Sequence, residues 1–386
     1  MYLSKGAALV LFWCFVVLLN LVSARFSRVG DLLLLTATLY IFVVSFKANW
    51  VNRESFAVFL GFVAIFAIYT VSTILNPSIA AAIITTQVMT CAAVFFVFYA
   101  NAHRYSDRAD AIVVVFVFLV MALMLGVSVD LAGKNVYSGT IVYLLLFLSL
   151  LLQQGSARPS RRIGTWTFIG VVILGLVFDQ RAMQLAGLIA LVAFWILLDL
   201  NHVLVRWLGL ACVVALVLVM VFMTAGIAGF SINTIDDLVV EYSGRTAKSG
   251  RQVIWPILVY FIGQKPLFGW GAGTLPRDVI ETTLSAHSYY LQILLQTGFV
   301  GLVALIGLFL AVAKRYRTVH SRKDKYLRAY MWSCVFLIVF HASSEVFLMQ
   351  NNMVVAVPLW MLLGAGAGLF GRVPTELEAD SGARIG

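Results

Sequence analysis

Apolar residues run along the chain in long blocks that short polar stretches separate. A block of about 20 apolar residues can cross the hydrocarbon core of a bilayer as an α-helix. Helices are favoured there because they satisfy their backbone hydrogen bonds within the segment. The pattern therefore predicts an all-α integral membrane protein with about twelve transmembrane helices, over residues 7–23, 29–46, 55–75, 79–100, 109–130, 136–152, 163–178, 182–200, 203–229, 287–313, 330–349 and 353–371.

The polar connections differ greatly in length. Most hold only a few residues, but one loop covers residues 230–286. A long loop without repeats on a compact scaffold is usually functional. The chain thus divides into a first set of helices over 1–229, the loop over 230–286, a second set over 287–371 and a tail over 372–386.

Charge supports this interpretation and orients the chain. Only 11% of the residues are charged and the mean hydropathy is +0.98, whereas soluble proteins are about 25% charged. Lys and Arg concentrate in cytoplasmic loops, and the densest basic block here is 314–328. We therefore expect both termini in the cytoplasm and the long loop on the outer side of the membrane. The other basic residues are scattered, which argues against a nucleic-acid partner.

No common cofactor or metal motif is present. The four cysteines all fall inside apolar spans and are expected to be small core residues. Their spacing suggests neither a zinc site nor a disulfide framework, and the chain lacks a Walker A loop, a GxSxG elbow and an HExxH motif. We therefore expect neither a cofactor nor a metal.

Candidate chemistry gathers at the predicted outer ends of the helices. Ser285 is a plausible N-cap, which would place His287 in the first turn of an outward-facing helix. Such a helix end attracts anions, and a neutral histidine there could accept a proton near pH 7. The alternative is a capping or interfacial histidine.

Arg181 lies between two apolar spans with almost no loop, beside Asp179. A charge at membrane depth suggests function, although an interfacial pair with Asp179 is the alternative. His341 and Glu345 are four residues apart, hence on one face of a predicted helix. They are expected either to line the outer cavity and contact substrate or to pair with each other.

The long loop contains the glycine-rich segment PLFGWGAG over 266–273. Glycines allow backbone to approach a ligand closely, so Gly269, Trp270 and Gly271 are predicted substrate contacts. A plain turn is the alternative.

Three segments carry a resemblance to a known family: SGR over 243–245, PLFGWGAG, and AHSYYLQILLQTGFVGL over 286–302. They resemble the O-antigen ligase and O-antigen polymerase superfamily of bacterial envelopes, the ligases most closely. In the ligases a His is followed by Ser, Asn or Gln, then nine residues, then Gly-x-x-Gly, matched here by His287, Ser288, Gly298 and Gly301. The family also has an arginine at the outer mouth of a helix and one in the long loop, which Arg181 and Arg245 match.

The resemblance implies a metal-free and ATP-independent reaction at the periplasmic face of a bacterial inner membrane. A polysaccharide on undecaprenyl diphosphate would be transferred, with inversion, to a sugar hydroxyl of the lipid A core. Arg245 and Arg181 would bind the diphosphate, with Arg251 in reserve, and His287 would be the base. Ser288 beside it is a predicted substrate contact. The expected partners are therefore the lipid-linked donor, the lipid A core and membrane lipids.

Two alternatives remain open. A polymerase would use the same donor chemistry to extend another lipid-linked glycan. A secondary transporter would also fit the number of spans and the buried charges, but transporters usually show repeats and broken helices near the midplane. This chain shows neither clearly, and its polar residues gather at one surface.

Overall fold

The computed structural model describes residues 55–106, 134–155, 161–199, 211, 251–280, 285–317, 322–350 and 352–370. Within these residues every regular element is a helix. The predicted spans 7–23, 29–46 and 109–130, nearly all of 203–229, and Arg245 lie outside them.

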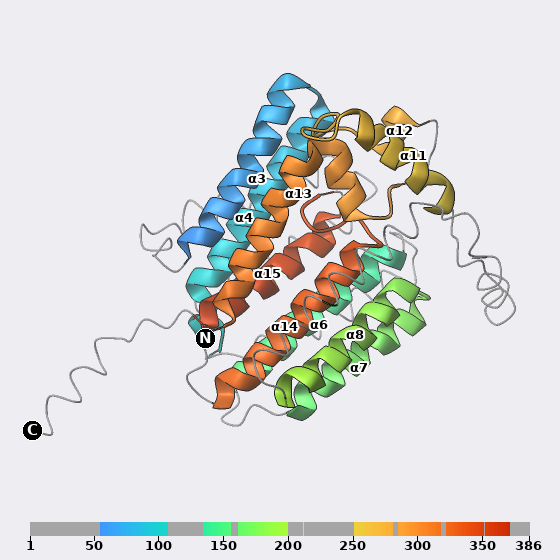
Figure 1. Cartoon of the computed structure of the whole chain (residues 1–386). Helices are drawn as coiled ribbons and strands as arrows, with labels where there is room; N and C mark the ends of the chain where they lie inside the picture. Colours follow the sequence, from blue (N-terminus) through green and yellow to red (C-terminus); the bar gives the residue numbers. More distant parts are fainter. Residues whose placement is uncertain are drawn as a thin grey trace, which may run out of the picture.

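The helices form an inclined bundle, with α11 and α12 beside one of its ends (Figure 1). Their bounds are α3 (Phe56–Leu75), α4 (Ile79–Ser106), α6 (Lys134–Gly155), α7 (Arg161–Val177), α8 (Arg181–Asp199), α11 (Arg251–Gln264), α12 (Pro276–Val279), α13 (Tyr289–Arg315), α14 (Arg322–Ala342) and α15 (Met353–Leu369). Among the described residues, four helices are long and apolar enough to cross a membrane, namely α3, α4, α8 and α13.

The bundle is organised around α15, in which every residue is buried. It packs closely on α4 and also on α6, while α13 packs on α3 and α14 packs on α8. A Cβ at Gly364 or Gly368 would collide with the backbone carbonyl of Phe95 or Tyr99. Small residues of this kind let membrane helices approach closely. Cys91 and Cys334 are buried and free, as predicted for core residues.

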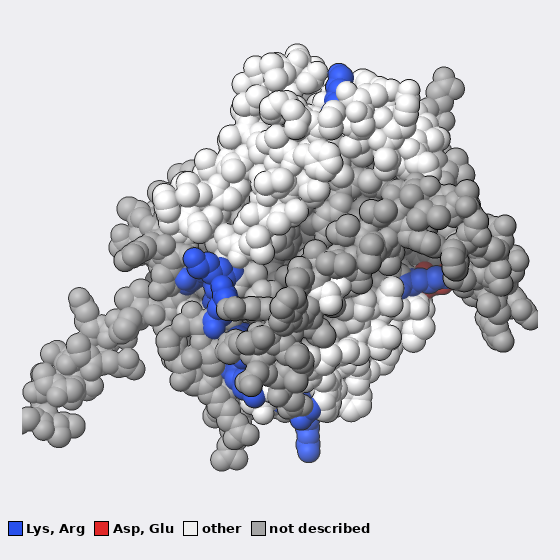
Figure 2. Space-filling view, viewed as in Figure 1, with Lys and Arg blue, Asp and Glu red and all other residues white. Residues whose placement is uncertain are grey.

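Most neighbouring helices run antiparallel, but α15 runs parallel to α4, with Gly364 beside Phe95 and Gly368 beside Tyr99. These directions sort the connections into two ends. Tyr330 of α14 contacts Phe194 of α8, and because α14 and α8 run antiparallel, Ala342 lies level with the start of α8. We call the end that carries residues 76–78, 178–180 and 285–288 the outer end. Lys and Arg on the face shown in Figure 2 gather toward the opposite end, where α13 ends and α14 begins. That opposite end is the one that the charge bias predicts to be cytoplasmic.

The boundaries of α14 differ from the predicted span 330–349. The helix covers Arg322–Ala342, and Val346–Gln350 are buried but not helical. The hydroxyls of Ser343 and Ser344 bond back to the carbonyls of Phe340 and His341 at 2.7 and 3.0 Å. These side chains compete with the helix for its last acceptors. The prediction that His341 and Glu345 share a helical face is therefore wrong.

Candidate active site

The start of α13 places His287 just outside the helix. The N-cap is Ser288, whose hydroxyl accepts from the amide of Leu291, and the helix begins at Tyr289. The predictions that Ser285 is the N-cap and that His287 lies in the first turn are therefore wrong. The physical reason is that the backbone of His287 has a φ of 45°, which is not helical. Ser288 itself is fully buried, so its predicted contact with substrate stays a prediction.

The backbone of His287 is held on both sides. The indole nitrogen of Trp255, from α11, donates to the carbonyl of Ala286 at 2.8 Å. The amide of His287 donates to the hydroxyl of Ser285 at 3.1 Å. These bonds stabilise a left-handed backbone conformation that a non-glycine residue adopts only at a cost, and such conformations cluster at functional sites.

The side chain of His287 faces Glu345. Its Nδ1 atom lies 3.8 Å from Oε2 of Glu345, which is close enough for an ion pair but too long for a hydrogen bond. Nδ1 is buried and has no hydrogen-bond partner among the described residues, although the side chain as a whole is 33% exposed. The exposed part of the ring is therefore the part away from Nδ1. The imidazole can present Nε2 outward while Glu345 faces its inner nitrogen.

Arg181 lies at the same end of the bundle. It is the first residue of α8 and is exposed, after a tight turn in which Asp179 has a φ of 54°. Twelve residues separate Tyr330 from Ala342, and the same number separates Phe194 from Ala182. Each stretch rises about 18 Å, so Arg181 stands level with the end of α14, just before Glu345. The predicted grouping of Arg181 and His287 at one end is consistent with this packing.

The glycine-rich segment is bonded to α13 through its backbone. Gly298 interrupts α13 with φ 64° and ψ −161°, which separates the carbonyls of Leu295 and Gln296 from the amides of Phe299 and Val300. The segment supplies the missing partners from residues 266–271. The four bonds run from Trp270 N to Leu295 O, Gly271 N to Gln296 O, Phe299 N to Pro266 O and Val300 N to Leu267 O, at 2.8–3.2 Å. We call these four bonds the clamp.

The clamp explains why PLFGWGAG and the Gly-x-x-Gly motif occur together. A Cβ at Gly269 would overlap the backbone of Gln296, and one at Gly298 would overlap the carbonyls of Pro266 and Leu267. The close approach predicted for these glycines therefore exists, but its partner is α13. Trp270 donates from its indole to Phe261 O at 2.8 Å, and substrate contact by Gly269, Trp270 and Gly271 stays a prediction.

Polar residues inside α13 extend this connection, and sequence reasoning missed them. The side-chain amides of Gln292 and Gln296 both donate to the backbone carbonyl of Thr274, at 2.9 and 3.2 Å. Tyr69 of α3 donates to Gln296 at 3.2 Å. Two glutamines four residues apart in an apolar helix were the signal that could have revealed it.

The remaining predicted residues are placed as follows. His341 is 3% exposed; its Nδ1 lies 3.0 Å from the hydroxyl of Tyr143 and its ring packs on Phe347. These contacts indicate a core role, and its predicted contact with substrate stays a prediction. Arg251 is the first residue of α11. Among the described residues, no group of three or more His, Cys, Asp or Glu residues could hold a metal ion.

Comparison with known families bears on the region that builds this site. Residues 167–306 match the family described as O-antigen ligase. This region is similar to the O-antigen ligase and polymerase superfamily. The match contains Arg181, Arg245, His287 and Gly298, but ends before Glu345. Members of this superfamily transfer glycosyl groups in lipopolysaccharide synthesis. No curated protein matches the chain.

Proposed function

We propose that the protein is an O-antigen ligase, an inverting glycosyltransferase that moves a polysaccharide from undecaprenyl diphosphate to the lipid A core on the periplasmic face. The observation that carries the proposal is the pairing of His287 with Glu345 at the outer end, level with Arg181. A base and a cation are the two groups that such a transfer needs. The similarity to the superfamily supports the reaction class, and the geometry supports the proposed roles of these residues.

The base in this scheme is Nε2 of His287. Glu345 favours the tautomer with its proton on Nδ1, as a carboxylate behind a catalytic histidine does. The separation of 3.8 Å is compatible with this role, because catalytic hydrogen bonds are often long without substrate and shorten in the complex. Glu345 is 21% exposed, so water screens the pair only partly.

The transfer forms one bond and breaks one. The acceptor hydroxyl gives its proton to His287 and its oxygen bonds the anomeric carbon, while the bond from that carbon to the diphosphate oxygen breaks. The leaving diphosphate keeps the electron pair and gains negative charge. Arg181 and Arg245 would bind it with forked donors, which stabilises charge that develops in the transition state.

The test is transfer in proteoliposomes, from a defined undecaprenyl-diphosphate glycan to purified rough lipopolysaccharide. His287→Ala and His287→Gln should each lose well over tenfold in rate, since positioned proton transfer is typically worth about 10²–10⁴-fold. His103→Gln is the matched control, because His103 lies at the opposite end of α4. Membrane abundance is measured for each variant. Near-normal transfer by His287→Gln would show that the histidine is not the base.

A separate experiment distinguishes ligase from polymerase. Cells that lack a ligase accumulate long undecaprenyl-linked polymer while their lipid A core stays bare. Cells that lack a polymerase make no such polymer. The second phenotype would replace the proposed acceptor with another lipid-linked glycan and leave the roles of His287 and Arg181 unchanged.

A further inference from the structure

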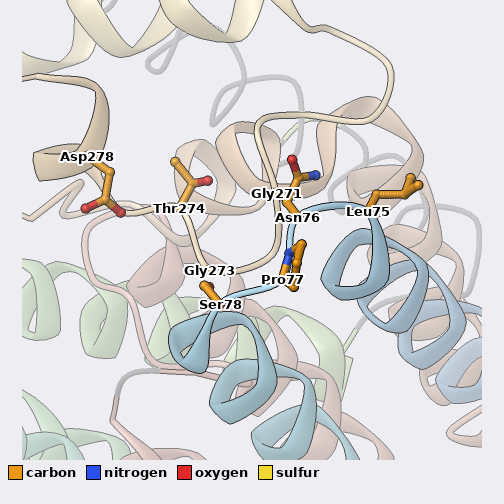
Figure 3. A pocket seen from close by; sticks show the side chains of 8 residues that line it. All are labelled: Leu75, Asn76, Pro77, Ser78, Gly271, Gly273, Thr274 and Asp278. Carbon is orange, nitrogen blue, oxygen red and sulfur yellow. The ribbon is translucent and has the colours of Figure 1, made fainter.

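A cavity of about 400 Å³ opens at the outer end, beside the segment that the clamp holds. One wall is the turn between α3 and α4, and the other is the chain from Gly271 to α12 (Figure 3). Its polar lining comes from Asn76, Ser78, Thr274 and Asp278. Sites for small molecules typically measure about 300–1,000 Å³ and hold a few convergent polar groups.

Three of these polar residues are fixed before any ligand arrives. Oγ of Ser78 accepts from the amide of Ala81 at 3.0 Å, which leaves its proton available for donation. Oδ2 of Asp278 accepts from the amide of Leu275 at 2.7 Å, which leaves the other carboxylate oxygen. The backbone of Thr274 is held through its carbonyl by two glutamines of α13. Binding to such groups orders little that is not already ordered.

Asn76 supplies the fourth polar group. Its side chain lies against Gly271, where a Cβ would come within 3.0 Å of the Asn76 Cβ atom. Among the described residues, neither the side-chain amide of Asn76 nor the hydroxyl of Thr274 has a hydrogen-bond partner. Both are therefore available to a ligand, and the amide can donate and accept at once.

The composition of the lining selects the chemistry of the ligand. Hydroxyl, amide and carboxylate groups suit a compound rich in hydroxyls, and none of the described residues that line the cavity is Lys or Arg. Without a cation and with one carboxylate, the cavity is poorly suited to a phosphate or diphosphate. We propose that it is a saccharide subsite of the proposed transfer reaction, on which this inference rests.

The position of the cavity indicates which part of a saccharide it would hold. Gln292, which bonds to Thr274, lies about one turn inside α13, whereas His287 precedes the helix. The subsite would therefore hold a sugar residue away from the bond that reacts. That sugar belongs either to the donor glycan or to the core oligosaccharide of the acceptor.

Kinetics of the full-length protein in proteoliposomes test the proposal and separate the two sources. Asn76→Ala and Thr274→Val each remove a side-chain group that has no described partner. Each variant should raise KM about 2–12-fold for one of the two substrates, the effect of one lost hydrogen bond. The value of kcat should stay nearly unchanged, because such binding is uniform along the reaction. Thr86→Val is the matched control, since Thr86 bonds to Ala82 within α4, away from the cavity.

The KM that changes identifies the substrate that occupies the subsite. A rise confined to the donor KM assigns the subsite to the donor glycan, and a rise confined to the acceptor KM assigns it to the core oligosaccharide. Unchanged KM values for both substrates in both variants would overturn the proposal.

Direct binding separates this proposal from the proposed function. Saturation-transfer NMR with free O-polysaccharide and with free core oligosaccharide should show binding to the wild type and to Thr86→Val. Binding of one of them should weaken in Asn76→Ala and in Thr274→Val. If the wild type binds a saccharide in this way but transfers none, the subsite stands and the proposed function fails. No binding to the wild type, or equal binding by all variants, would overturn the subsite.

Discussion

Replacing Gly298 with alanine tests whether the clamp organises the outer end. With φ 64° and ψ −161°, Gly298 has a backbone conformation that is essentially confined to glycine, and adopting it costs an alanine about 1–3 kcal/mol. Its Cβ would also overlap the carbonyls of Pro266 and Leu267, which accept the two clamp bonds from Phe299 and Val300. Each lost bond removes about 0.5–1.5 kcal/mol. The expected loss of stability is therefore roughly 2–6 kcal/mol.

Gly307→Ala is the matched control, because a Cβ at Gly307 of the same helix would meet no atom within 4 Å. That substitution should be neutral or should stabilise the protein by up to about 1 kcal/mol. The measurements are thermal unfolding in detergent and the rate of glycan transfer in proteoliposomes. Gly298→Ala should lower both, since the segment that it displaces also carries Thr274 and leads toward His287.

A double-mutant cycle tests whether Gly298 and Gly269 act through the same contact. Gly269→Ala attacks the same contact from the other side, where a Cβ would overlap the backbone of Gln296. Because both changes break one unit, their combined effect should be smaller than the sum. If Gly298→Ala matches Gly307→Ala in stability and rate, or if the two clamp changes add fully, the clamp does not organise this end.

Three further predictions follow from the bundle. Arg181→Ala should greatly reduce the rate of glycan transfer while the protein still accumulates in the membrane. Arg181→Lys should restore only part of the rate, because lysine lacks the forked pair of donors that arginine offers to a phosphate. Equal rates for Arg181→Ala and the wild type would show that Arg181 is not part of the site. An impermeant thiol reagent should label Arg277→Cys but not Ser321→Cys in intact cells whose outer membrane has been permeabilised. The reverse pattern would show that the predicted orientation is inverted. Gly364→Leu should lower the unfolding temperature by more than Gly307→Leu does, because its side chain would collide with the carbonyl of Phe95; equal shifts would contradict the close packing of α15 on α4.

Hydropathy located the helices well where lipid or the protein core sets their length. Each predicted span within the described residues contains a helix, and the start of α8 at Arg181 lies within one residue of the prediction. Hydropathy failed at the end of α14, because Val346–Gln350 are as apolar as a helix would be there. What ends the helix is the pair of hydroxyls at Ser343 and Ser344, whose competition for carbonyls a hydropathy window does not register.

The candidate site was predicted only in part. The charge bias and the resemblance predicted that Arg181 and His287 lie at the same end of the molecule. The packing of α8 on α14 is consistent with that prediction. The contact between His287 and Glu345 was missed because the predicted helix ran through Glu345 and directed it toward His341. The clamp was missed because its bonds join backbone groups about 30 residues apart, and backbone groups leave little trace in side-chain patterns.

The buried segment Val346–Gln350 has a consequence for how the protein is made. Its backbone is not helical, so it cannot enter lipid alone without leaving polar groups unsatisfied. The carbonyl of Leu348 accepts from the indole of Trp360 at 2.6 Å and from the thiol of Cys91 at 3.9 Å, so α4 and α15 must both be present before this segment can settle. Glu345 lies immediately before it. We therefore expect the carboxylate that faces His287 to reach its place only when α15 has docked. In the proposed mechanism, glycan transfer would then begin only after α4 and α15 have packed together.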